Sequence, residues 1–222
     1  FLRQTVRGIV WGLSSHSEFP RLKKISRLVQ PEPVMTDWQR RVCLAIAEQS
    51  FVSLGHVLDS VIPTYAKSRK KKLADSIQTT PFNSSGQQLP TESTWWYRQR
   101  RDAHDWIFSW LNEHSITSRI VMVPTIEDGL ELYQLFSATV PGIAWVDSKL
   151  SAGAYTELYE GVRTGSITKV IGTGRILTLP FPTSPQVLVD QEEHPAHKQT
   201  EQQPKTDFRH VLETVKVDVR IT

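Results

Sequence analysis

The stretch RIVMVPTIEDGLELYQLF, residues 119–136, decides the fold class, because a short apolar run leads directly into a helical pattern. Residues 119–124 are mostly apolar with no alternation, which predicts a strand buried on both of its faces. Residues 126–136 carry apolar side chains at helical spacing and predict a helix. A buried strand followed by a helix is typical of a parallel sheet, because parallel strands need a crossover connection.

The same alternation continues through the second half of the chain. Short apolar runs predict further strands at residues 142–146, 169–172 and 186–190. Helical spacing predicts helices at residues 102–114 and 152–164. Short buried strands that alternate with helices indicate an α/β fold with a parallel sheet and right-handed crossovers.

The front of the chain has a different pattern. Residues 5–13 are β-branched and residues 22–29 alternate, so both predict strands. Residues 38–49 and 54–62 then predict two helices, and Thr36 and Asp37 supply capping chemistry for the first.

A polar stretch separates the two parts. Residues 64–94 lose periodicity and are rich in Lys, Ser, Gln, Thr and Pro, which is typical of a linker that is flexible at least in part. The sequence thus predicts a β-containing domain at residues 1–63, a basic and polar linker at residues 64–94, and an α/β lobe at residues 95–222.

Composition excludes several classes of protein. The 222 residues are 39% hydrophobic and 22% charged, a balance that argues against general disorder. No apolar run approaches the roughly 18 residues that a membrane helix needs. Phe1-Leu2-Arg3-Gln4 is neither a signal peptide nor an initiator-Met start, which indicates a piece of a longer chain. The single cysteine, Cys43, lies in an apolar run, so we expect a core thiol in a reduced, cytoplasmic protein.

The net charge of +3 hides a segregation of charge along the chain. Residues 1–63 hold eight Lys and Arg against five Asp and Glu, and residues 64–72 add five Lys and Arg and no acid. Residues 73–222 hold thirteen basic and eighteen acidic residues, a net charge of −5. The basic front of +8 predicts contact with a polyanion, although the lysine run is equally well explained as a solvated linker.

One strand end carries candidate chemistry. The apolar residues 187–189 are followed by Asp190, Gln191, Glu192 and Glu193. This is the shape of a Walker B element, in which the Asp holds Mg²⁺ and the next Glu orients the water that attacks phosphate. A surface strand that ends in acids gives the same pattern.

Several separate segments support a family resemblance. In the second half they are Val146-Asp-Ser-Lys-Leu-Ser151, Arg163-Thr-Gly165, the run from Lys169 to Phe181, and Val189-Asp190 with Lys198-Gln199. In order and spacing this set resembles the first helicase lobe of primosomal protein N-prime, the replication-restart helicase PriA. At the front, the segments are Arg7-Gly-Ile-Val10, Ser17-Glu-Phe-Pro20, Arg21-Leu-Lys23, Glu32-Pro33, and Leu54 to Leu58 with Pro63. These resemble the later part of the DNA 3′-end-binding domain of that family.

The resemblance implies a partial DNA-binding domain followed by a RecA-like helicase lobe. The implied partner is forked, single-stranded or 3′-ended DNA, together with other primosome or replication proteins. Lys23 matches the family lysine of the 3′-end pocket, and basic neighbours are candidate phosphate contacts. The candidate DNA-binding residues are Arg7, Arg21, Lys23, Lys24, Lys70, Lys71 and Lys72.

The chain departs from the PriA pattern where that family binds nucleotide. Trp95-Trp-Tyr-Arg-Gln-Arg-Arg-Asp102 stands in place of the Gly-rich phosphate loop, with Arg101 at the position of the lysine. Without glycines the backbone cannot wrap phosphates. Gln191 replaces the Glu that orients water, and a neutral amide is not a base. A register shifted by one restores Glu192-Glu193-His194 but loses the Asp.

Two more departures are Thr125 in place of Glu and Gly174-Arg175 in place of Arg-Ser. We therefore expect a helicase-like lobe that neither binds nor hydrolyses ATP, with no catalytic residues and no cofactor, although the family activity is an ATP-dependent 3′–5′ DNA helicase. The degenerate nucleotide site would comprise Arg101, Asp102, Asp190, Gln191 and Glu192. Two alternatives stay open: an active ATPase with an unusual phosphate site, and a scaffold whose acidic back end docks a replication protein.

Two other clusters carry candidate chemistry. His194 and His197 beside two glutamates have the spacing of metal ligands, but Pro195 interrupts the helix that this spacing requires, so no metal is expected. An aromatic and basic group either stacks on single-stranded bases or packs the start of a helix against the sheet. Its members are Trp95, Trp96, Tyr97, Arg98, Arg100 and Arg101.

Overall fold

The computed structural model describes residues 8–18, 20–21, 24–28, 33–62, 92–94, 99–113, 117–147, 149–200, 204–216 and 219–221. Residue contacts divide the chain into two compact units, Phe1–Pro31 and Glu32–Thr222. None of the helices that the structure describes is long and apolar enough to cross a membrane.

The described part of the first unit has no regular secondary structure. Residues 8–13 and 24–28, which the sequence predicts as parts of two strands, pair with no other strand among the described residues. Both strand predictions are therefore wrong where the structure describes them. A strand is stabilised by its neighbours in a sheet, and an alternating pattern alone supplies no partner.

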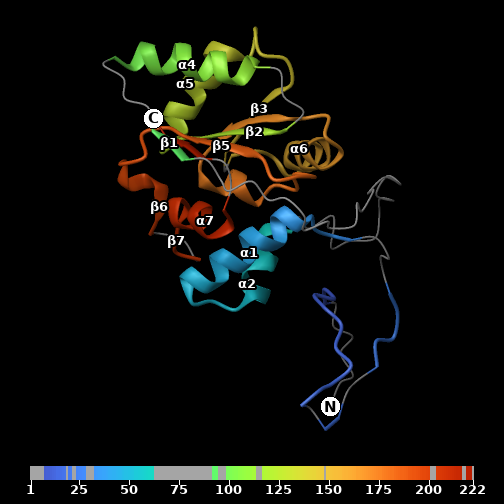
Figure 1. The fold of residues 1–222 in the computed structure, drawn as a ribbon. Helices are drawn as coiled ribbons and strands as arrows, with labels where there is room; N and C mark the ends of the chain where they lie inside the picture. The colour runs from blue at the N-terminus through green and yellow to red at the C-terminus, as the bar shows by residue number, and fades with distance from the viewer. Residues whose placement is uncertain are drawn as a thin grey trace. The chain divides into compact units, whose positions relative to one another are not determined.

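The second unit is built on a six-stranded sheet whose adjacent strands are all parallel, in the order β1-β8-β5-β2-β4-β3 (Figure 1). The strands are β1 (Glu92–Thr94), β2 (Arg119–Met122), β3 (Ile143–Val146), β4 (Lys169–Gly172), β5 (Gln186–Val189) and β8 (Val219–Ile221). The α/β class and the parallel sheet are confirmed. The four strands predicted in this half all form, each within two residues of its predicted ends.

Helices cover both faces of the sheet. They are α1 (Asp37–Ser50), α2 (Leu54–Val61), α4 (Arg100–Asn112), α5 (Ile126–Phe136), α6 (Ala152–Thr164) and α7 (Phe208–Val215). Figure 1 shows α4 and α5 on one face and α1 with α7 on the other. The helices α5 and α6 have the bounds that helical spacing predicts, and each begins after a capping hydroxyl, at Thr125 and Ser151.

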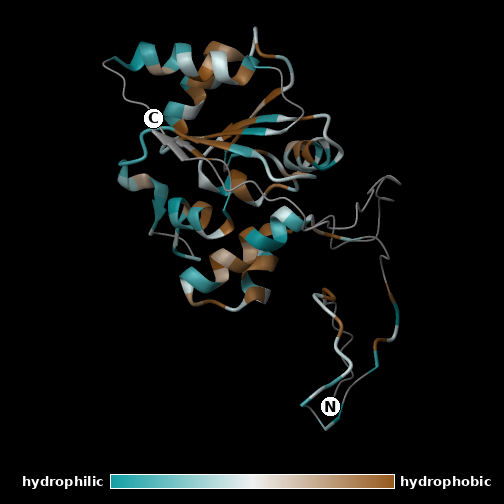
Figure 2. Ribbon diagram, in the orientation of Figure 1, coloured by the Kyte–Doolittle hydropathy of each residue, from teal (hydrophilic) through white to brown (hydrophobic). Residues whose placement is uncertain are grey.

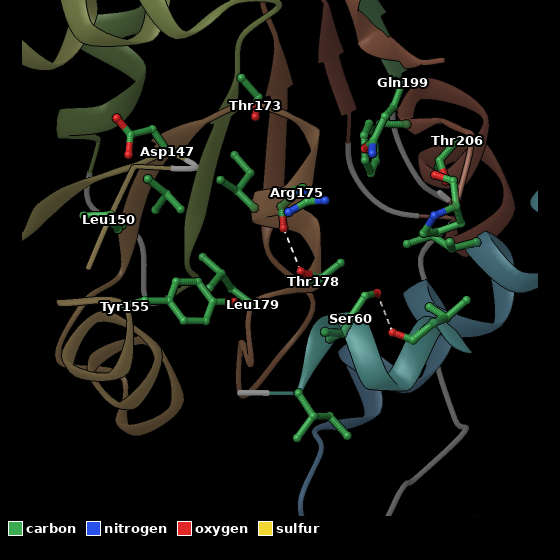
Figure 3. A pocket seen from close by; sticks show the side chains of 18 of the residues that line it. Ser60, Asp147, Leu150, Tyr155, Thr173, Arg175, Thr178, Leu179, Gln199 and Thr206 are labelled. Atoms are coloured by element: carbon green, nitrogen blue, oxygen red, sulfur yellow. Dashed lines mark hydrogen bonds between the residues drawn. The ribbon is translucent and has the colours of Figure 1, made fainter. Parts of the chain in front are cut away.

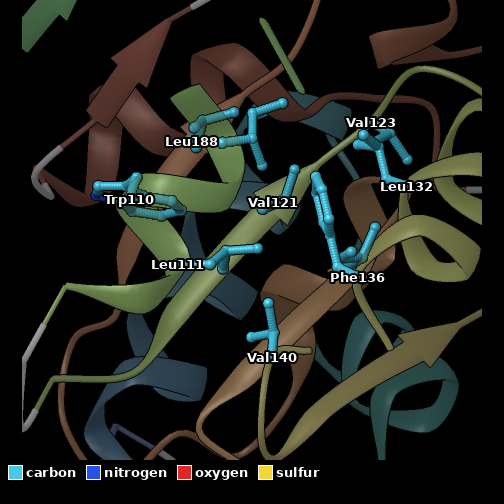
Figure 4. Packing of buried hydrophobic residues seen from close by; sticks show 10 residues of the cluster. Trp110, Leu111, Val121, Val123, Leu132, Phe136, Val140 and Leu188 are labelled. Atoms are coloured by element: carbon cyan, nitrogen blue, oxygen red, sulfur yellow. The ribbon is translucent and has the colours of Figure 1, made fainter. Parts of the chain in front are cut away.

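The core between the sheet and the helices α4 and α5 is apolar (Figures 2 and 4). It joins Trp110 and Leu111 of α4 to Leu132 and Phe136 of α5, across the side chain of Val121 in β2. Alternate residues of β2 face the two layers, so the whole strand is buried, as its unbroken apolar run predicts.

The helices α1 and α2 belong to the same compact unit as the sheet, although the sequence predicts them as part of a domain at residues 1–63. Trp38 of α1 is buried, and its Nε1 donates to the backbone oxygen of Leu177 at 2.8 Å. Cys43 lies on the buried side of α1, where burial raises the pKa of its thiol to about 12. A thiol with that pKa is an inert core group and not a nucleophile.

Several elements were not predicted. They are the 3₁₀ helices η1 (Gly174–Thr178) and η2 (Pro195–His197), the short antiparallel pair β6 (Lys198–Gln199) and β7 (Thr206–Asp207), and the elements α7, β8 and β1. Residues 92–94, predicted as the end of the linker, instead pair with β8 as the edge strand β1. The rest of that linker prediction, residues 64–91, lies outside the described residues.

Candidate functional site

Asp190 lies at the carboxyl end of β5, inside the sheet and not on an exposed edge. Its side chain is fully buried, and its backbone N–H donates to the oxygen of Met122 in the adjacent strand β2 at 2.9 Å. The carboxyl ends of parallel strands are where α/β sheets bind ligands. The Walker-like aspartate is therefore in the position that the sequence pattern predicts.

Arg100, the first residue of α4, pairs with this carboxylate. Its Nη1 lies 3.0 Å from Oδ2 and 3.3 Å from Oδ1 of Asp190, and its Nη2 lies 3.3 Å from Oδ1 of Asp128 in α5. The guanidinium thus joins the start of one helix to a second helix and to the end of a strand. The closest of these contacts, at 3.0 Å, is an ion pair, and the two hydrogen bonds are long at 3.3 Å each.

Thr125 extends the same network by one residue. Its Oγ1 donates to Oδ2 of Asp128 at 2.6 Å and accepts the N–H of that residue at 3.1 Å, which makes it the N-cap of α5. Thr125, Asp128, Arg100 and Asp190 therefore form one continuous chain of polar contacts, which we call the Asp190 network.

Arg101 and Asp102 lie on the exposed surface of α4. The residue that reaches Asp190 is Arg100, one position before the residue aligned with the phosphate-loop lysine. Residues 95–98 of the predicted aromatic group lie outside the described residues. The sequence grouped Arg100 with aromatic neighbours and gave no sign that its guanidinium turns toward the sheet.

Gln191 and Glu192 follow in a tight loop. Gln191 adopts a left-handed backbone conformation with a φ of 51°, and its amide Nε2 is buried without a partner among the described residues. Glu192 is held from α7, because Arg209 Nη1 donates to its backbone oxygen at 2.8 Å and lies 3.6 Å from its carboxylate. Arg209 thus holds Glu192 in place, whereas the Gln191 amide nitrogen makes no hydrogen bond to a described residue.

His197, in η2, contacts the backbone of this loop. Its Nε2 lies 2.9 Å from the backbone oxygen of Asp190 and 3.1 Å from that of Gln191, so this nitrogen carries the proton and donates. Burial, and secondarily the positive charge of Arg209, lower the pKa of His197. The imidazole is thus a neutral structural group. The part of the chain that the structure describes contains no cluster of three side chains suited to a metal.

A separate cavity of about 480 Å³ lies in the second unit (Figure 3). Its lining includes Asp147 and Thr173, which follow β3 and β4, together with Tyr155 of α6, Arg175 of η1 and Ser60 of α2. Arg175 stands at one of the positions where the sequence departs from the PriA pattern. Its peptide oxygen accepts the hydroxyl of Thr178, which fixes the turn of η1.

Comparison with known families gives one match. Residues 1–63 fit the family model of the PriA 3′DNA-binding domain (3′BD). The front of the chain is PriA-like. No curated protein matches the chain.

The PriA-like front contains the predicted DNA-binding residues Arg21 and Lys24, and both are exposed. The other predicted contacts, Arg7, Lys23 and Lys70 to Lys72, lie outside the described residues. The matched segment continues through α1 and α2, whereas the compact units divide after residue 31. The helical end of the PriA-like front is therefore packed into the unit that contains the sheet.

Proposed function

We propose that this chain is a DNA-binding protein of replication restart or primosome assembly that recognises forked or 3′-ended DNA. The match of residues 1–63 to the PriA 3′DNA-binding domain carries this proposal. The charge of +8 over residues 1–72 supports it, because Lys and Arg side chains supply sequence-independent affinity for phosphates.

The proposal extends to the lobe that follows: a RecA-like helicase lobe that neither binds nor hydrolyses ATP. A buried aspartate at the end of an inner strand of a parallel sheet supports the RecA-like assignment. Two observations support inactivity. Gln191 is an amide where a water-orienting carboxylate is needed, and Asp190 is paired with an arginine of its own chain.

The deciding experiment is fluorescence anisotropy with labelled forked DNA, a 3′-tailed duplex and a blunt duplex, with and without ATP. We expect tighter binding to the fork and the 3′ tail than to the blunt duplex, and no effect of ATP. Equal affinity for all three duplexes would contradict recognition of DNA structure. Binding of ATP at micromolar concentration, or phosphate release stimulated by DNA, would favour an active ATPase instead.

Charge reversal separates DNA recognition from a scaffold role. The double variant Lys23→Glu and Lys24→Glu should lose affinity for forked DNA, because each reversal replaces attraction to phosphate by repulsion. Lys205→Glu, at an exposed lysine in the unit that contains the sheet, is the matched control and should bind as the wild type does. Unchanged affinity in the double variant would favour a protein scaffold.

A further inference from the structure

The residues at the end of β5 do not fit the Mg²⁺ that the resemblance implies there. A guanidinium donates hydrogen bonds and cannot ligate a metal, and Arg100 directs two such groups at the carboxylates of Asp190 and Asp128. Asp190 has no solvent-exposed side-chain surface from which a cation could approach.

We propose that Arg100 is a built-in cation. Its guanidinium replaces the divalent metal as the permanent counter-charge of Asp190, so this edge of the sheet is complete without metal or nucleotide. The inference rests on the proposed function, in which the lobe is a degenerate nucleotide-binding fold. It adds that Arg100 takes the place of the metal ion.

Electrostatics explains why a substitute is needed. A fully buried carboxylate loses its hydration and is costly unless a positive charge or several hydrogen bonds compensate it. Arg100 keeps 30% of its side chain exposed, so it retains part of its own hydration while neutralising Asp190. The pair therefore costs less to bury than a fully enclosed ion pair.

The geometry explains why arginine serves here. Asp190 follows β5, Asp128 lies in α5 and Arg100 in the first turn of α4, and a planar fork can meet two carboxylates at once. Thr125 then holds Asp128 in place through two hydrogen bonds.

Two of the departures from the PriA pattern belong to the Asp190 network. Arg100 occupies the position of the second loop glycine in the PriA pattern, and Thr125 occupies the position of the glutamate after Val-Pro. Both are contacts of the Asp190 network. Two changes that look like independent losses at the level of sequence are thus parts of one compensated arrangement.

The test is thermal unfolding of the full chain in the absence of nucleotide and DNA, with and without millimolar Mg²⁺. We expect Arg100→Met to lower the Tm by on the order of 10 °C, because it removes the positive charge that lies 3.0 Å from a buried carboxylate. Arg101→Met changes the neighbouring exposed arginine of the same helix and should shift the Tm by only about 2 °C or less. The Tm of the wild type should not change with Mg²⁺.

A double variant tests whether the loss comes from the uncompensated charge of Asp190. Arg100→Met with Asp190→Asn removes both charges and should recover most of the loss, because the neutral pair leaves no buried charge. Arg100→Lys retains the positive charge and should unfold between the wild type and Arg100→Met, which also covers the case in which Arg100→Met does not fold. The inference is overturned by a wild-type Tm that rises with Mg²⁺, by equal Tm values for the two Met variants, or by additive losses in the double variant.

These outcomes are separate from those of the proposed function. Equal Tm values for Arg100→Met and Arg101→Met would contradict the proposal that Arg100 replaces the metal. They would not affect the conclusions about DNA binding and ATP. If instead the variants show the expected order of Tm values but the wild type binds ATP, the proposal that the lobe is inactive would be wrong.

Discussion

Gln39 Nε2 of α1 donates to the backbone oxygen of Thr178 in η1 at 2.8 Å, across 139 residues of sequence. The same amide donates to Tyr159 Oη of α6 at 3.1 Å, and its oxygen accepts the N–H of Thr36 at 3.2 Å. Gln39 is fully buried. One side chain therefore caps its own helix and fixes that helix against two elements of the second unit.

We expect Gln39→Ala to lower the free energy of unfolding by about 1–3 kcal/mol, because the oxygen of Thr178 would stay buried without its donor. Urea unfolding measures this loss. Gln134→Ala makes the same change on the exposed surface of α5 and should cost less than about 0.5 kcal/mol. Equal losses in the two variants would show that the buried contacts of Gln39 contribute nothing.

Gly174 is required by packing, not by backbone conformation. A Cβ at this position would overlap the ring of Phe208, the first residue of α7. Gly174→Ala should therefore cost about 1–3 kcal/mol through overpacking, as measured by urea unfolding. Adding Phe208→Leu to Gly174→Ala should cost less than the sum of the two single losses, whereas strict additivity would contradict the clash.

His197 should make the protein less stable in mild acid. Burial lowers its pKa in the folded state below the ordinary value of about 6.5, so the unfolded chain takes up a proton first as the pH falls. The stability supplied by the neutral ring is complete above the unfolded pKa and falls as the pH drops from there toward the folded pKa. Urea unfolding from pH 7 to pH 5 should show a smaller loss for His197→Gln than for the wild type.

The exposed His210 is the control for that experiment, with the variant His210→Gln. This variant makes the same substitution of histidine by glutamine while leaving the buried ring in place. An unchanged slope in His197→Gln would mean that another group accounts for the acid sensitivity.

Asp207 should stabilise α7 except in strong acid. The hydrogen bonds from Arg209 lower the pKa of Asp207, whose Oδ1 also accepts the N–H of Arg209 as the helix cap. Because the folded pKa is depressed, this stability is present above the ordinary value of about 3.9 and is lost as the pH falls through the folded pKa. Asp207→Ala should cost about 1 kcal/mol at pH 7 and little at pH 2, as measured by thermal unfolding.

Binding to DNA should weaken steeply with salt. If three basic side chains of the PriA-like front contact phosphates, affinity for forked DNA should fall roughly 40-fold between 50 and 200 mM salt, because bound counterions are released. Anisotropy titrations at several salt concentrations give the slope. A flat dependence on salt would contradict phosphate contacts as the source of affinity.

Local periodicity in the sequence determined much of the second unit. The helix at residues 126–136 and the strand at residues 169–172 begin and end where the pattern predicts. Capping residues and apolar spacing act within a few residues of each other, so they can be read without knowing the rest of the chain. The same reasoning placed Asp190 at a strand end.

Long-range contacts decided the rest. The alternation at residues 22–29 predicts a strand, but a strand needs a partner, and residues 24–28, the part that the structure describes, pair with no described residue. Residues 92–94 look like a polar linker and become an edge strand because β8, more than 120 residues later, pairs with them. Whether a segment finds a strand partner is not encoded in its local sequence.

The candidate site divides in the same way. The sequence by itself determined the chemistry of its parts: a carboxylate at the end of a buried strand, a glutamine in place of a glutamate, and a loop without glycines. Only the tertiary structure decided that Arg100, and not Arg101, reaches Asp190. Successive helix residues point about 100° apart, so which arginine turns inward depends on how α4 is rotated against the sheet, and packing of the core sets that rotation.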